Sequence, residues 1–135
     1  MRKRGVALLG LALVLGAASA SAERPDIWGT KTKTATATSA QTDTALWTPA
    51  SGKRVALQGC VISATKAMQV ELEVSDVDVV PPIYFDSYGR LTIGGDSTLL
   101  YVGDPDAVLT YSTTNSGHSG SHGSVSIACW GYEVQ

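Results

Sequence analysis

The chain has 135 residues, with ten Lys or Arg against twelve Asp or Glu and a formal net charge of −2. This balance argues against nucleic acid as a partner, because affinity for phosphate needs clustered cationic side chains. The length suits one domain with a single core.

The first 22 residues have the pattern of a secretory signal peptide. Basic residues at positions 2–4 precede an apolar run from Val6 to Leu15, and small residues then lead to an A-x-A cleavage site at 20–22. We predict cleavage near Ala22 and a mature protein that is secreted, periplasmic or at the cell surface. Three basic residues leave with this leader, so seven remain against twelve acidic ones, a net charge of −5. No later apolar run is long enough to span a membrane, and we expect no membrane insertion.

Residues 23–42 form a Thr-rich segment in which Thr recurs at period two from Lys31 to Thr38. Thr favours strands because its branched Cβ fits the pleat. The segment is either a polar N-terminal strand at an exposed edge or an arm that joins a neighbouring subunit. Residues 43–135 form the predicted β-sandwich domain.

That domain has the pattern of short strands separated by turn residues. Residues 54–63 are mostly apolar, and apolar residues alternate with polar ones from Met68 to Val74, which predicts a strand with one buried face. We expect Pro81-Pro82 to break the chain before a strand at 83–85. No stretch beyond the leader shows helical spacing. Further strands are predicted at Arg90–Ile93, Ser97–Val102, Ala107–Ser112 and Val125–Val134.

The two cysteines, Cys60 and Cys129, are predicted to form one disulfide, because an exported chain meets an oxidising compartment. Two buried free thiols are the alternative. A cysteine nucleophile is disfavoured, since neither residue lies in a motif that stabilises a thiolate. The bridge requires an early core strand and the last strand to be neighbours in one sheet, or to face each other across the sandwich.

Candidate metal ligands are few. His118 and His122 are spaced i, i+4, but they lie in a Gly/Ser loop without a nearby Cys or carboxylate, so a solvated loop is the favoured interpretation and no metal is predicted. Asp76 with Asp78, and Asp104 with Asp106, resemble no EF-hand loop and are better explained as turn formers. We predict no cofactor.

No catalytic motif is present either. The chain lacks the G-x-S-x-G sequence of a nucleophile elbow, and the carboxylates show no spacing specific to glycoside hydrolysis, so we predict that the protein is not an enzyme. Candidate ligand-binding aromatics are Trp47, Trp130 and Tyr132. Trp130 and Tyr132 would share one strand face, with Cys129 on the other. Core packing or burial between subunits is the alternative for all three.

The order of motifs resembles small jelly-roll structural and decoration-like proteins of tailed phages and prophages. The resemblance covers about residues 43–135 and rests on the turn at 50–54 (A-S-G-K-R), the strand through Cys60, the alternation at 70–74 and the closing W-G-Y-E-V strand at 130–134. It implies a non-catalytic virion component, often trimeric. The leader and the disulfide depart from that pattern, because phage structural proteins assemble in the cytoplasm.

These observations predict an all-β, antiparallel jelly-roll-like β-sandwich of about eight strands with one disulfide. The leading functional hypothesis is a secreted non-catalytic structural or interaction module that forms a homo-oligomer, with a trimer implied by the resemblance alone. The alternatives are a carbohydrate-binding module, which would contact a surface glycan, and a virion-type decoration protein. A protein at the cell surface is a further candidate partner.

Overall fold

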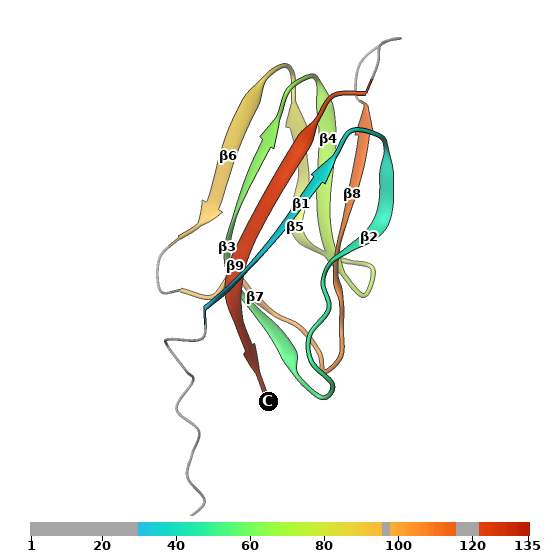
Figure 1. Cartoon of the computed structure of the whole chain (residues 1–135). Coiled ribbons are helices and arrows are strands. Elements are labelled where there is room, and N and C mark those ends of the chain that lie inside the picture. Colours follow the sequence, from blue (N-terminus) through green and yellow to red (C-terminus); the bar gives the residue numbers. More distant parts are fainter. Residues whose placement is uncertain (1–29, 96–97, 116–121) are drawn as a thin grey trace, which may run out of the picture.

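The computed structural model describes residues 30–95, 98–115 and 122–135 (Figure 1). The predicted leader at 1–22 and His118 lie outside these segments. Within them the chain forms nine strands and no helix, so no helix of the described residues is long and apolar enough to cross a membrane. The strands are β1 (Lys31–Ala37), β2 (Gln41–Trp47), β3 (Arg54–Ala64), β4 (Met68–Val74), β5 (Val77–Phe85), β6 (Gly89–Gly94), β7 (Tyr101–Val102), β8 (Leu109–Asn115) and β9 (Val125–Val134).

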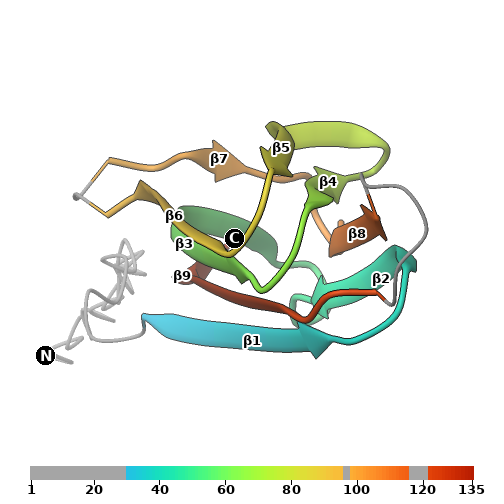
Figure 2. The same ribbon diagram turned by 90° about the horizontal axis from the view of Figure 1, so that it is seen from above.

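The strands form two antiparallel sheets that pack face to face (Figure 2). Sheet A has the order β1-β9-β3-β6, with β7 also paired to β3, and sheet B has the order β2-β8-β4-β5. The pairs β1·β9, β2·β8, β3·β6 and β4·β5 are those of one long hairpin with its tip between β4 and β5. Rolling this hairpin up adds the pairs β3·β9 and β4·β8. The predicted jelly-roll-like sandwich is therefore confirmed, with nine strands where about eight were expected.

The core lies between the sheets and follows from the alternation of the strands. In β4 every second residue from Met68 to Val74 is buried, as the sequence predicts for a strand with one wet face. Thr113 is a buried polar residue; its hydroxyl accepts from the Gln41 N–H at 3.2 Å and donates to the Ser39 carbonyl at 3.4 Å. The largest fully buried apolar side chains are Trp47, Leu57, Ile62, Met68, Leu72, Leu109 and Ile127.

Two strand predictions were wrong. The chain does not break at Pro81-Pro82, because β5 runs through both prolines from Val77 to Phe85. This is possible because β5 is an edge strand with register irregularities, so a proline without an N–H removes no ladder bond on its open side. The strand expected at Ser97–Val102 is reduced to Tyr101–Val102, since residues 98–100 are outside any strand.

The disulfide between Cys60 and Cys129 is confirmed. The two residues are direct cross-strand partners on β3 and β9, their Cα atoms are 4.1 Å apart, and both side chains are fully buried. Of the two arrangements that the sequence left open, the structure has the neighbours within one sheet. The bridge therefore fixes the β3·β9 pair, which exists only once the hairpin has rolled up.

Replacing both cysteines by alanine should lower the free energy of unfolding by about 2–4 kcal/mol, because the bridge closes a loop of 69 residues that the unfolded chain otherwise explores freely. Urea titration followed by far-UV circular dichroism measures this loss. The native bridge should resist dithiothreitol without denaturant, since both sulfurs are shielded from solvent. An unchanged urea midpoint in the double variant would show that the bridge contributes nothing.

Candidate functional site

The outer face of sheet A carries mainly small and hydroxyl side chains, together with Arg90 and the half-buried Trp130 and Tyr132. Cross-strand register places its outward residues in rows that run over β1, β9, β3 and β6. Three rows extend over all four strands: Thr36–Ser126–Ser63–Arg90, Thr34–Ala128–Val61–Thr92 and Thr32–Trp130–Gly59–Gly94.

Trp130 lies across this face because its neighbour on β3 is a glycine. A Cβ atom added to Gly59 would lie 2.7 Å from Trp130 Cε2, so only the absence of a side chain lets the indole lie against the strand. The ring extends toward the end of β6, where a Cβ on Gly95 would lie 4.0 Å from Cζ2. The side chain of Trp130 is half-buried, and its indole N–H makes no hydrogen bond within the described segments. The ring is therefore held against β3, and its N–H is a donor that the described residues do not use.

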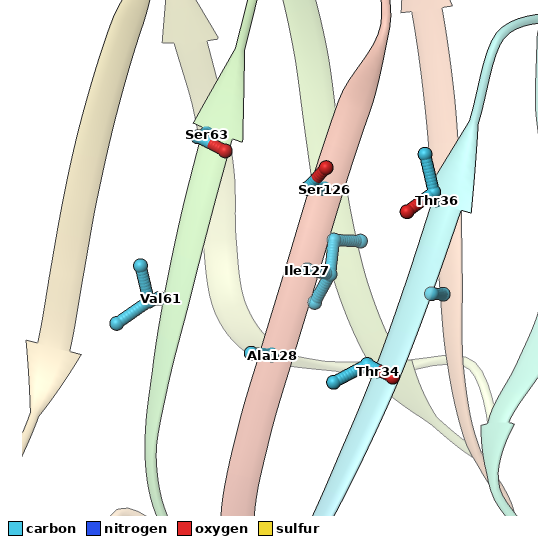
Figure 3. Close-up of a pocket in the computed structure, with 8 residues that line it drawn as sticks. Thr34, Thr36, Val61, Ser63, Ser126, Ile127 and Ala128 are labelled. Carbon is cyan, nitrogen blue, oxygen red and sulfur yellow. The ribbon is translucent and has the colours of Figure 1, made fainter.

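A shallow depression of about 280 Å³ lies beside Trp130 on the same face (Figure 3). Figure 3 shows the hydroxyls of Thr34 and Thr36 on β1 and of Ser126 on β9 around it. Ser63 supplies a fourth hydroxyl from β3, and none of the four is hydrogen-bonded within the described part of the chain. The depression thus offers donors and acceptors that the fold itself does not use. The lining residues are Thr34, Ala35, Thr36, Val61, Ser63, Ser126, Ile127 and Ala128.

Of the three aromatic candidates, Trp130 and Tyr132 are half-buried on β9, while Gly131 and Cys129 between and before them are buried. Trp47 is different: it is fully buried in the core and is not available to stack on a ligand. Its indole N–H donates to Glu133 Oε1 at 3.0 Å, which explains how a buried Trp satisfies its polar atom. Trp47 is therefore a core residue, which is the alternative that the sequence left open for it.

Glu133 joins three parts of the sandwich at one end. Besides Trp47 on β2, its carboxylate accepts the backbone N–H of Ala50 at 3.2 Å and pairs with Lys31 Nζ on β1 at 3.0 Å. Burial by itself raises the pKa of Glu133, but the hydrogen bonds from Trp47, Lys31 and Ala50, together with the charge of Lys31, outweigh it and lower the pKa to about 2. This carboxylate is a structural group, fully engaged with its own chain.

The outer face of sheet B is acidic and internally bonded. Burial raises the pKa of Glu73, and the nearby charges of Asp43, Asp78, Glu71 and Asp76 raise it further. Polar side chains here bond to one another or to the backbone: Gln69 donates to Glu71, Ser112 to Asp43 at 3.5 Å, and Thr110 to the Glu73 carbonyl at 3.3 Å. Sheet B therefore differs from sheet A, where the hydroxyls of Thr34, Thr36, Ser63 and Ser126 have no such partner among the described residues.

The predicted turn and metal candidates have local structural roles. Asp76 and Asp106 have left-handed backbones, with φ of 60° and 62°, and the Asp106 carboxylate accepts the Gly52 N–H at 2.6 Å. His122 lies against the carbonyl of the next residue, and its Nε2 is buried without a partner. Within residues 30–95, 98–115 and 122–135 no three His, Cys, Asp or Glu side chains gather as metal ligands would.

One edge of sheet A is apolar. Of the seven exposed large apolar or aromatic residues in the described segments, four belong to β6, β7 or the chain just before β7. We call this set the β6–β7 edge; it comprises Leu91, Leu99, Leu100 and Val102, each between 37% and 44% exposed.

Sequence reasoning missed the depression and the β6–β7 edge. Gly59 alone gives no signal, because its role depends on the register that puts it opposite Trp130. The hydroxyls of Thr34 and Ser126 come from segments far apart in the chain. Pairing of β1 with β9 brings them to one face, and the rolled topology, which pairs β3 with β9, adds the hydroxyl of Ser63.

No protein-family model matches the chain, and no curated protein matches it significantly in sequence. The functional argument therefore rests on the residues and geometry described above.

Glu133 should make the free energy of unfolding depend on pH in the acid range. Its pKa falls from 4.5 to about 2 on folding, so its contribution is complete above about pH 4.5 and is lost as pH falls toward 2. Glu133→Gln should lower the free energy of unfolding at pH 7 by about 1–3 kcal/mol, because charged hydrogen bonds to Trp47 and Ala50 are weakened. The variant should also show a smaller decrease of the urea midpoint as the pH falls from about 4.5 toward 2. An unchanged decrease would contradict this assignment, and Asp104→Asn is the control for loss of an exposed carboxylate.

Proposed function

We propose that the protein is an exported, non-catalytic interaction module that associates with itself through the β6–β7 edge of sheet A. Export is supported by the leader pattern at residues 1–22 and by the buried disulfide, which suits an oxidising compartment. A non-catalytic role is supported by the lack of a catalytic motif in the sequence.

The observation that carries self-association is the contrast between β6 and the other sheet edges. Unpaired strand edges invite pairing with another chain, and proteins guard them with Lys, Pro or irregular register. Edge strand β1 carries Lys31 and Lys33, and β5 carries Pro81 and Pro82. The register of β2 is broken twice against β8.

Strand β6 has none of these devices beyond a single charge. It pairs with β3 in unbroken register from Gly89 to Gly94, contains no proline, and has Arg90 as its one charged residue. Apolar side chains of the β6–β7 edge flank its open side. Burying them against an equivalent set would remove exposed apolar area from water at about 25 cal/mol per Å².

The occupant that fits this edge is a second copy of the same chain. Antiparallel pairing of two β6 strands about a two-fold axis satisfies both open edges at once and keeps the two outer faces of sheet A on the same side. This geometry favours a dimer, whereas the trimer expectation comes from the resemblance to phage structural proteins. A virion-type decoration role shares the fold but is opposed by the leader.

The test is the molar mass of the mature, disulfide-bonded protein by sedimentation equilibrium over a range of concentrations. We expect a reversible dimer that Leu91→Lys and Leu100→Lys together shift to monomer. Val77→Lys is the matched control, since Val77 is an exposed apolar residue on sheet B. A monomer at every concentration would refute self-association, and a dimer that the paired Lys variant leaves intact would refute the β6 edge as its site.

A further inference from the structure

We propose that the outer face of sheet A binds the pyranose rings of a neutral polysaccharide, with Trp130 as the stacking platform and the adjoining depression as the hydroxyl-binding subsite. This inference does not depend on self-association, because every residue in it belongs to one chain.

The first argument is the shape of the Trp130 platform. The indole rests on Gly59, so the sheet holds the ring in place, and the ring is half-buried rather than covered. A pyranose ring has an apolar face of C–H groups and a rim of hydroxyls, so it is complementary to an aromatic plane beside polar groups. An aromatic side chain already fixed against a strand loses little conformational freedom when a ligand stacks on it.

The second argument is the unused hydrogen-bonding capacity of the depression. Thr34, Thr36, Ser63 and Ser126 each carry a hydroxyl that donates and accepts, and none is bonded within the described segments. On sheet B, by contrast, Gln69 and Ser112 already donate to carboxylates of the same face. The open set on sheet A suits a ligand that is itself rich in hydroxyls.

The third argument is the arrangement of the two parts. Ser126, Ala128 and Trp130 are successive outward residues of β9, so the depression and the platform follow one another over about 13 Å of strand. Ala128 and Val61 give the depression an apolar floor between the hydroxyls. The lining carries no charge, which favours a neutral chain over an acidic or basic one.

The exposed aromatic residue of sheet B provides an internal comparison. Tyr84 is 65% exposed on β5, beside Gln69, and stands on the face that carries Asp43, Glu71 and Glu73. Mere exposure of an aromatic ring is therefore not enough for the proposed site. What distinguishes Trp130 is its glycine support and its unpartnered hydroxyl neighbours.

The test uses two-dimensional NMR of the mature protein titrated with soluble fragments of cellulose, starch, chitin and xylan. At least one fragment should shift the indole N–H signal of Trp130 while that of the buried Trp47 stays in place. Trp130→Ala should weaken binding of that fragment roughly tenfold or more, and Tyr84→Ala should leave it unchanged.

A second pair of variants separates binding from folding. Thr34→Val with Thr36→Val removes two hydroxyls at nearly constant shape and should weaken binding by several-fold while the urea midpoint is kept. Thr114→Val, an exposed residue on sheet B, is the matched control. The proposal is overturned if no fragment shifts the Trp130 signal, or if binding survives both Trp130→Ala and the Thr double variant. Trp130-dependent binding of a protein alone would equally overturn it.

Discussion

The pairing of β3 with β9 is the constraint on which the rest of the structure depends. These strands are distant in sequence and become neighbours only when the long hairpin rolls up, so their pairing closes the sandwich. The buried Cys60–Cys129 bridge joins them at directly opposed positions. The same pairing sets Trp130 against Gly59 and lines up the hydroxyls of three strands. The arrangement of the outer face of sheet A thus follows from the same β3·β9 pair that closes the sandwich.

The outer faces of the two sheets differ in whether their polar side chains are already hydrogen-bonded. On sheet B the carboxylates lie close enough to raise the pKa of Glu73, and neighbouring side chains occupy their hydrogen-bonding groups. On sheet A the carboxylate of Glu133 is already occupied by hydrogen bonds from Trp47 and Ala50 and by the ion pair with Lys31. The depression on sheet A is lined by uncharged residues, and Arg90 is the charged residue at the β6 end of its rows. This asymmetry, rather than exposure alone, is the reason for proposing sheet A as the face that binds a ligand.

Local patterns in the sequence were sufficient to predict most strands. The candidate site could not be predicted from them, because it depends on which strands are neighbours in the sheet. The alternation from Met68 to Val74 gives the bounds of β4 to the residue, because a strand with one buried face has an apolar residue at every second position. The expected break at Pro81-Pro82 failed because a proline is tolerated on an edge strand, and edge position is not encoded locally. Trp47 appeared equivalent to Trp130 in sequence. Its hydrogen-bond partner Glu133 lies 86 residues away, so the contact that satisfies its indole N–H could not be inferred from neighbouring residues.

The most direct test of the central claim is hydroxyl-radical footprinting of the mature protein with and without a bound polysaccharide fragment. If the outer face of sheet A is the binding face, the fragment protects Trp130 from oxidation while Tyr84 and Tyr88, 65% and 76% exposed, react as before. Protection of Tyr84 or Tyr88 with Trp130 unchanged would contradict the account and move the binding face away from sheet A.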